Sequence, residues 1–184
     1  MERVIRTLTV PVAGPIFERA ALSLFLVLTT FLGAYVAVPL PFTPVPLTLQ
    51  TFFVLLSGVL LGRGWSLGTQ CAYLGLGGAG WAAFAGAAAG SAHLFGPTAG
   101  YLWAFPLAAV LTGTLWRRSE KAAPRLFALA AADALILGAG ALWLGVLLGL
   151  SPWKAFLMGV APFLPGEALK VTMVLAVGTF RRKG

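Results

Sequence analysis

The sequence predicts an all-α, polytopic membrane protein that forms a single bundle of six transmembrane helices. Of its 184 residues, 59% are hydrophobic and 10% are charged, whereas a soluble domain carries about a quarter charged residues. The mean hydropathy is +0.93, and the apolar residues gather in segments of nearly spanning length or more. The basic residues lie in short clusters beside those segments. One compact domain over residues 1–184 suits this length.

The first predicted span covers residues 20–38, after a flank that contains Arg3, Arg6 and Arg19. A basic flank before an apolar run is also found in secretory signals, but no clear small-residue cleavage site follows here. We therefore expect a retained first helix. The remaining spans are expected at 47–61, 65–85, 98–116, 125–149 and 166–180.

The distribution of basic residues predicts the orientation of the bundle. Eleven of the 13 lysines and arginines fall on one side if six spans alternate, and Lys154 falls on the other. Because basic loops remain in the cytoplasm, we expect cytoplasmic termini in the plasma membrane of a prokaryote. The connections at 39–46, 86–97 and 150–165 should then face outward. The eleven residues are Arg3, Arg6, Arg19, Arg63, Arg117, Arg118, Lys121, Arg125, Arg181, Arg182 and Lys183.

The stretch "PLPFTPVPLTLQ" over residues 39–50 interrupts the apolar pattern with four prolines. Proline removes a backbone donor, so no regular helix passes through this stretch. The 16 residues from Pro46 to Leu61 would rise about 24 Å as a helix, less than the ~30 Å hydrocarbon core. Irregular backbone at membrane depth is tolerated where it lines a cavity. The proline stretch, together with two further irregular outer loops, therefore predicts an outward-facing ligand pocket.

Glu167 and Lys170 are the strongest candidates for ligand contacts. They lie three residues apart in "PFLPGEALK", which places them on one helix face, and Pro165 suits the first turn of that helix. Ionisable residues inside a membrane bundle are functional candidates. The alternative is a structural ion pair at the helix end.

Asp133 lies in the predicted span over 125–149 and has no basic residue nearby in the sequence to pair with. We expect it to be a hydrogen-bonded structural residue.

Aromatic residues flank the outer loop over 86–97. We expect Phe84 and Tyr101 to line an apolar cavity, with Trp81 beside them. His93 lies in the loop that should cover the pocket, and a metal role for it has no supporting ligands. The single cysteine excludes an internal disulfide.

Four segments resemble the BioY family, the biotin-specific substrate-binding (S) components of energy-coupling factor (ECF) transporters. The segments are "PLPFTPVPLTLQTFFVLLSGVLLG", "YLGLGGAGW", "LFGPTAGYLWAFPLAA" and "PFLPGEALK", and the resemblance runs from about residue 20 to 177. It implies a six-helix membrane protein that captures biotin from outside with high affinity. It also implies partners, a transmembrane T subunit and two ATPase subunits, which drive release inward.

The resemblance also implies roles for individual residues. Glu167 and Lys170 match the family's acid-x-x-lysine pair, which contacts the polar end of biotin, although relatives usually have aspartate in place of this glutamate. A carboxylate suits the ureido N–H groups and an ammonium suits an oxygen. The apolar ring of biotin would lie among aromatic side chains, and the proline loop would cover it with Phe42 and Thr43 near the ligand. The expected ligand-binding residues are Glu167, Lys170, Tyr101, Phe84, Trp81, His93, Phe42 and Thr43.

The expected function is therefore biotin capture for ATP-driven import, without catalysis, a cofactor or a bound metal. The sequence has no phosphate-binding lysine loop, so energy from ATP would have to come from another subunit. A nucleic-acid role is disfavoured because no basic face with interleaved aromatics lies outside the spans. Three alternatives stay open: an S component for a different vitamin, an intramembrane lipid-modifying enzyme, and a structural assembly subunit.

Overall fold

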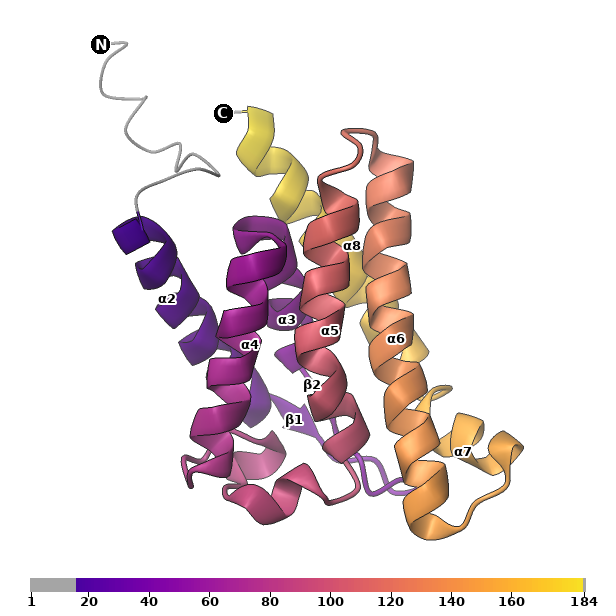
Figure 1. The fold of residues 1–184 in the computed structure, drawn as a ribbon. Helices are drawn as coiled ribbons and strands as arrows, with labels where there is room; N and C mark the ends of the chain where they lie inside the picture. The colour runs from indigo at the N-terminus through magenta and orange to yellow at the C-terminus, as the bar shows by residue number, and fades with distance from the viewer. Residues whose placement is uncertain (1–15, 184) are drawn as a thin grey trace, which may run out of the picture.

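The structure is a computed structural model, and it describes residues 16–183. These residues form seven α-helices, two short 3-10 turns and one two-stranded hairpin (Figure 1). Arg3 and Arg6, which contributed to the predicted orientation, lie outside the described residues. The helices are α2 (Ile16–Tyr35), α3 (Gln50–Leu61), α4 (Arg63–Gly78), α5 (Ala99–Trp116), α6 (Ala122–Leu148), α7 (Pro152–Gly159) and α8 (Leu164–Lys183).

The predicted all-α bundle is confirmed, and each of the six predicted spans overlaps one helix, in order α2, α3, α4, α5, α6 and α8. By length and composition, α2, α5 and α6 could each cross a membrane, and α7 with α8 forms a fourth candidate bent by 55°. The central helix α3 has only 12 residues, because residues 47–48 of the predicted span form strand β2 (Leu47–Thr48). Helix α4 ends at Gly78 rather than near residue 85, ahead of a turn in which Gly80 has a φ of +107°.

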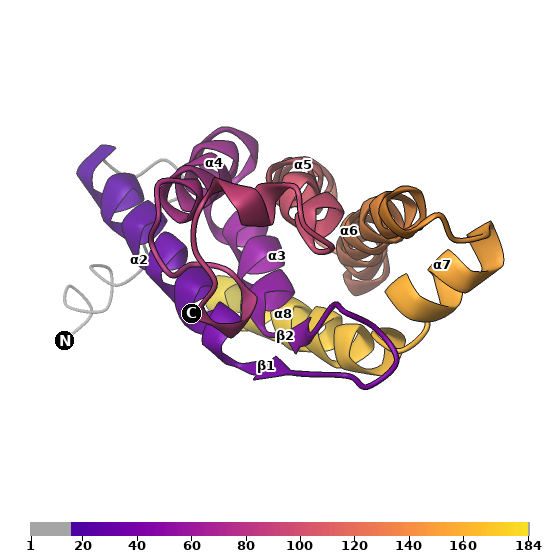
Figure 2. The ribbon, with the colours of Figure 1, turned by 90° about the horizontal axis from the view of Figure 1, so that it is seen from below.

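Helix α3 is the centre of the bundle. Seen along the bundle axis, α2, α4, α5 and α6 follow one another around one side, and α3 lies between them and α8 (Figure 2). It packs against all five of these helices. Most of its side chains are buried as a result, including the polar residues Gln50, Thr51 and Ser57. A short helix at the centre thus carries polar groups into the interior.

The bundle has two different ends (Figure 1). One end, called here the terminal end, holds the start of α2, the end of α8 and the turns between α3 and α4 and between α5 and α6. The other, called here the loop end, holds the three irregular segments that the sequence predicted on one side. It contains the hairpin of β1 (Ala37–Val38) with β2, the 3-10 turns η1 (Ala85–Ala87) and η2 (Ser91–Leu94), and α7.

The hairpin brings the proline stretch back to the start of α3. Its register pairs Ala37 with Thr48 and Val38 with Leu47. The backbone N–H of Leu49 then donates to the carbonyl groups of Gly33 and Val36, at 3.1 and 3.2 Å, which ties the start of α3 to the end of α2. The four prolines therefore lie in or beside a closed loop whose two ends are fixed.

Candidate functional site

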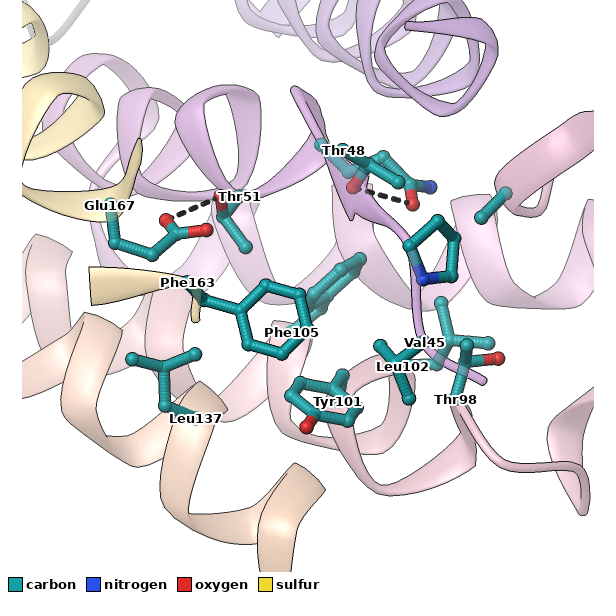
Figure 3. A pocket seen from close by; sticks show the side chains of 13 residues that line it. Val45, Thr48, Thr51, Thr98, Tyr101, Leu102, Phe105, Leu137, Phe163 and Glu167 are labelled. Atoms are coloured by element: carbon teal, nitrogen blue, oxygen red, sulfur yellow. Dashed lines mark hydrogen bonds between the residues drawn. The ribbon is translucent and has the colours of Figure 1, made fainter. Parts of the chain in front are cut away.

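A cavity lies at the loop end, where the hairpin, η1 and four helices meet (Figure 3). It leaves about 40 Å³ for the centres of water-sized molecules. Its walls come from segments far apart in the sequence. The residues that line the cavity are Val45, Pro46, Thr48, Gln50, Thr51, Ala85, Thr98, Tyr101, Leu102, Phe105, Leu137, Phe163 and Glu167.

One wall of the cavity is charged. The ammonium Nζ of Lys170 lies 2.6 Å from Glu167 Oε1, and both side chains are buried, at 6% and 3% exposure. Thr51 connects the pair to α3, because its hydroxyl donates to Glu167 Oε2 at 2.7 Å and accepts from Lys170 Nζ at 2.9 Å. Lys170 also donates to the backbone carbonyl of Thr48. Both Glu167 oxygens and all three ammonium protons of Lys170 therefore have partners.

The local sequence of α8 explains why this pair faces the cavity. Pro165 lies in the first turn of the helix, where its missing N–H has no intrahelical partner to lose. The N–H of Glu167 already donates to the carbonyl of Phe163 at 2.9 Å. A Cβ on Gly166 would lie 3.2 Å from the Leu47 side chain, so glycine lets α8 approach the hairpin. The predicted first-turn proline and shared helix face are confirmed.

A second polar set lies beside the charged wall and is neutral. Thr48 donates through its hydroxyl to Gln50 Oε1 at 3.3 Å, and the Gln50 amide donates to the hydroxyl of Tyr73. Tyr73 in turn donates to the carbonyl of Ala83 at 2.8 Å. This chain of hydrogen bonds links the hairpin, α3 and α4, and positions the segment that leads to η1.

The opposite wall is apolar and comes from α5, α6 and the turn before α8. Tyr101 and Phe163 pack edge to face with their ring centres 6.2 Å apart. The Tyr101 hydroxyl donates to the carbonyl of Gly159 at 2.7 Å, so only its ring faces the cavity. Phe105 and Leu137 complete this side (Figure 3). The cavity therefore combines one charged face with one face of rings and aliphatic groups.

Three of the eight expected ligand-binding residues belong to this arrangement. Glu167 and Tyr101 line the cavity, and Lys170 supports Glu167 from one turn further along α8. Phe84 is buried behind the cavity, where its ring packs against Tyr73 and His93 rather than lining the space.

The other four expected residues lie outside the cavity lining. Trp81 and Phe42 are 62% and 55% exposed, and His93 is also exposed. Thr43 is buried, but its hydroxyl accepts from the backbone N–H of Val45 at 3.3 Å, which shapes its own loop. The proline stretch does reach the cavity, through Val45 and Pro46 instead of Phe42 and Thr43.

The cavity also uses residues that sequence reasoning did not select. Thr48 and Gln50 stand in the first of the four segments that resemble the BioY family, so that segment could have identified them. Thr51 offers only one hydroxyl as a signal in a mostly apolar helix, and Phe105 and Phe163 have the pattern of ordinary core residues. Among residues 16–183, no group of three or more His, Cys, Asp or Glu side chains is arranged to hold a metal ion.

Asp133 lies in a different environment from the one expected. It is buried, but its Oδ1 has no hydrogen-bond partner in the described part of the chain. Its neighbours are Glu167 and Lys170, which α8 brings to α6 across more than 30 residues of sequence. Asp133 therefore has a basic neighbour that its sequence surroundings do not reveal, and its role as a hydrogen-bonded structural residue stays a prediction.

Comparisons with known proteins agree on one family. The sequence profile of the BioY family matches residues 7–183. The chain is 37% identical over 160 residues to a probable biotin transporter BioY from Pyrococcus horikoshii, covering 87% of this chain and 93% of that protein. It is 33% identical over 161 residues to the biotin transporter BioY from Thermotoga maritima, covering 82% and 88%.

A solved structure shows the same fold. It is the crystal structure of the S-component for biotin from an ECF-type ABC transporter, with a TM-score of 0.86 and 22% sequence identity. The match covers 91% of this chain and 92% of that one. The bundle with three irregular segments at one end is thus the S-component fold.

Proposed function

This chain belongs to the BioY family, and from that premise we propose that it is the biotin-binding membrane subunit of an ECF-type vitamin uptake transporter. The family relatives are named as transporters, which makes the chain a transport component and not an enzyme. The observation that carries the proposal is the charged wall of Glu167, Lys170 and Thr51, which shares one cavity with a wall of aromatic rings and aliphatic groups.

The two walls match the two parts of the biotin bicycle. Its ureido group has two N–H donors and one carbonyl acceptor, and its thioether ring is apolar. Glu167 can accept from the ureido N–H groups. Lys170 can donate to the carbonyl oxygen once it releases one of its present acceptors, the Thr48 carbonyl or the Thr51 hydroxyl. The rings of Tyr101, Phe105 and Phe163 offer a surface for the thioether ring. A buried ligand whose polar groups stayed unmatched would lose several kcal/mol of binding free energy.

The cavity as it stands is smaller than a ligand of this size needs. Sites for small molecules usually measure about 300–1,000 Å³. The walls must therefore separate for biotin to enter, and the irregular segments are the parts that can move without breaking helices. Val45 and Pro46 belong to the hairpin loop, so the hairpin is the proposed lid. Phe42 and Thr43 lie at the tip of that lid.

The proposal includes the orientation and the partners. The basic residues that flank the spans favour a cytoplasmic terminal end, with the loop end and its cavity facing outward in the cell membrane of a prokaryote. Release of biotin inward would then depend on a T subunit and two ATPase subunits, since this chain has no phosphate-binding loop.

Calorimetric titration of the purified protein with biotin tests the function directly. We expect saturable binding of one biotin per chain that riboflavin, thiamine and lipoate do not displace. Displacement by one of those vitamins would reassign the chain to another vitamin. No saturable binding of any of the four would favour an assembly role, and turnover of lipid by the purified protein would revive the enzyme alternative.

A further inference from the structure

The Thr51 hydroxyl is bonded to both members of the buried ion pair at once. It donates to Glu167 Oε2 at 2.7 Å and accepts from Lys170 Nζ at 2.9 Å (Figure 3). Thr51 lies in the first turn of α3, is 8% exposed and lines the cavity. A ureido group offers the same pair of functions, an N–H that donates and a carbonyl oxygen that accepts. The hydroxyl therefore makes the contacts to the ion pair that the ureido group of biotin would make.

Lys170 must release one acceptor before it can donate to a ligand, because an ammonium group has three N–H donors and all three are used. The acceptors are Glu167 Oε1 at 2.6 Å, the Thr48 carbonyl and the Thr51 hydroxyl. Release of Glu167 would break a buried ion pair, the most costly of the three losses. Release of the Thr48 carbonyl would take the ammonium donor from a backbone group and untie the hairpin from α8.

The Thr51 hydroxyl is the acceptor that Lys170 can release at the least cost. After release it still donates its proton to Glu167, so it loses one accepted bond and leaves no donor unpaired. Glu167 does not have to give up that bond for the ligand. A carboxylate has about four acceptor positions, so Glu167 can accept a ureido N–H beside the protons of Thr51 and Lys170.

We propose that Thr51 is the exchange partner of the site: the ureido carbonyl of biotin replaces the Thr51 hydroxyl as an acceptor for Lys170. The bond from Lys170 to the Thr48 carbonyl stays in place during the exchange, so the hairpin remains tied to α8 over the ligand. Biotin then competes with Thr51 for one proton of Lys170, and Thr51 lowers the affinity that the ion pair alone would give. This inference rests on the proposed function for the identity of the ligand.

Calorimetric titration of Thr51→Val with biotin tests the exchange through the sign of its effect. Valine has the shape of threonine without the hydroxyl, so without biotin one Lys170 proton and Glu167 Oε2 lose a partner. The ureido group supplies both partners when biotin binds. We therefore expect about fivefold tighter binding in the variant, as one net hydrogen bond would give. Unchanged affinity would overturn the exchange, and so would weaker affinity, which would make the hydroxyl a direct contact of biotin.

Two further variants separate the hydroxyl from the rest of the side chain. Thr51→Ser keeps the hydroxyl, so it should bind biotin less tightly than Thr51→Val. Thr172→Val is the matched control, since it removes an exposed hydroxyl of α8 that bonds within its own helix, and its affinity should equal that of the unmodified protein. Equal affinities in Thr51→Ser and Thr51→Val would contradict the proposal, because the hydroxyl would then not compete with the ligand.

Thermal unfolding with and without biotin distinguishes the exchange from a purely structural role. Without biotin, Thr51→Val should unfold at a lower temperature than the unmodified protein. At a fixed excess of biotin the rise in unfolding temperature should be larger in the variant, because a tighter ligand stabilises the folded state more. A structural role would lower both unfolding temperatures alike, so an equal rise in the two proteins would refute the exchange.

The unmodified protein separates this inference from the function on which it rests. If it does not bind biotin, the proposed function fails and the exchange fails with it. If it binds biotin and Thr51→Val does not bind more tightly, only the inference fails. Should Thr51→Val not fold, Thr51→Ala removes the same hydroxyl and is measured after purification with biotin. If neither variant folds even with biotin, the ligand does not supply the missing bonds and the proposal is wrong.

Discussion

The two ends of the bundle are built in different ways. At the terminal end the helices touch through glycine. A Cβ on Gly58 would lie 2.5 Å from the carbonyl oxygen of Ala109, and a Cβ on Gly113 would lie 2.7 Å from the backbone nitrogen of Arg63. Arg117 closes this end by donating from Nη2 to the carbonyl of Leu61 at 3.2 Å. Backbones that approach so closely leave little freedom to shift.

At the loop end, irregular segments are held by backbone hydrogen bonds, such as that from the N–H of Gly90 to the carbonyl of Gly77 at 2.9 Å, and by single side-chain hydrogen bonds. Trp103 donates to the carbonyl of Leu94 at 2.9 Å, and Trp143 donates to that of Gly96 at 2.8 Å. Tyr101 likewise holds the carbonyl of Gly159. Contacts of this kind can be broken one at a time. The comparison suggests that one end is a rigid frame and that the other can open around a ligand.

The largest expected effect concerns the close helix contacts at the terminal end. Gly58→Val would drive a branched side chain into Ala109 and Thr112, so we expect a loss of several kcal/mol of folding free energy, above the ~1–3 kcal/mol of ordinary overpacking. Thermal unfolding in detergent measures it. Gly68→Val is the matched control, since a Cβ there meets nothing within 4 Å. Equal unfolding temperatures for both variants would remove the basis for a rigid frame.

The second effect concerns the charged wall. Lys170→Ala and Glu167→Ala each leave a buried charge without its partner, which costs about 3–5 kcal/mol. We expect biotin affinity to fall by a factor of about 100 or more while the protein still inserts in the membrane. Lys154→Ala, at an exposed lysine of α7, should bind normally. Near-normal affinity in both charged-wall variants would contradict the site assignment.

A third effect concerns the mobility of the hairpin. Phe42 is exposed, so chymotrypsin should cleave after it when the hairpin opens. Bound biotin should hold the hairpin closed and slow that cleavage several-fold, because cleavage follows the population of the open form. Fragment masses over time measure the rate, with riboflavin as the ligand control. Equal rates with and without biotin would count against the hairpin as a lid.

The smallest effect concerns a single bond at the loop end. Tyr101→Phe keeps the ring on the cavity wall but leaves the carbonyl of Gly159 without its donor. We expect a loss of about 1 kcal/mol of stability and a reduction of biotin affinity by a few fold. Tyr35→Phe, at an exposed position at the end of α2, should change neither quantity. A Tyr101→Phe protein as stable as the unmodified one would show that this bond does not hold the loop end.

Much of the fold could be predicted from the sequence because membrane helices leave a simple pattern. Hydropathy located the six helices that overlap the predicted spans, and prolines and glycines located the three irregular segments at one end. The i, i+3 spacing found the Glu167–Lys170 pair, since that relation is local. The errors lay at helix ends, where residues 47–48 joined a strand and α4 ended early.

The rest of the site depends on contacts between distant segments, which spacing does not reveal. Thr51 and Glu167 are 116 residues apart in the sequence and 2.7 Å apart in the structure. Aromatic side chains were the least predictable group, because core, cavity and interface positions favour the same residues. Trp81 and Phe105 could not be told apart before their burial was known.

The small cavity and its proposed lid have a kinetic consequence. A ligand that enters only when the hairpin opens must also leave by that opening, so one rare event limits both arrival and escape. The residence time of the ligand then depends on the lifetime of the closed state as well as on the contacts in the cavity. A vitamin present at low concentration could thus stay bound until another subunit acts on the bundle and opens it.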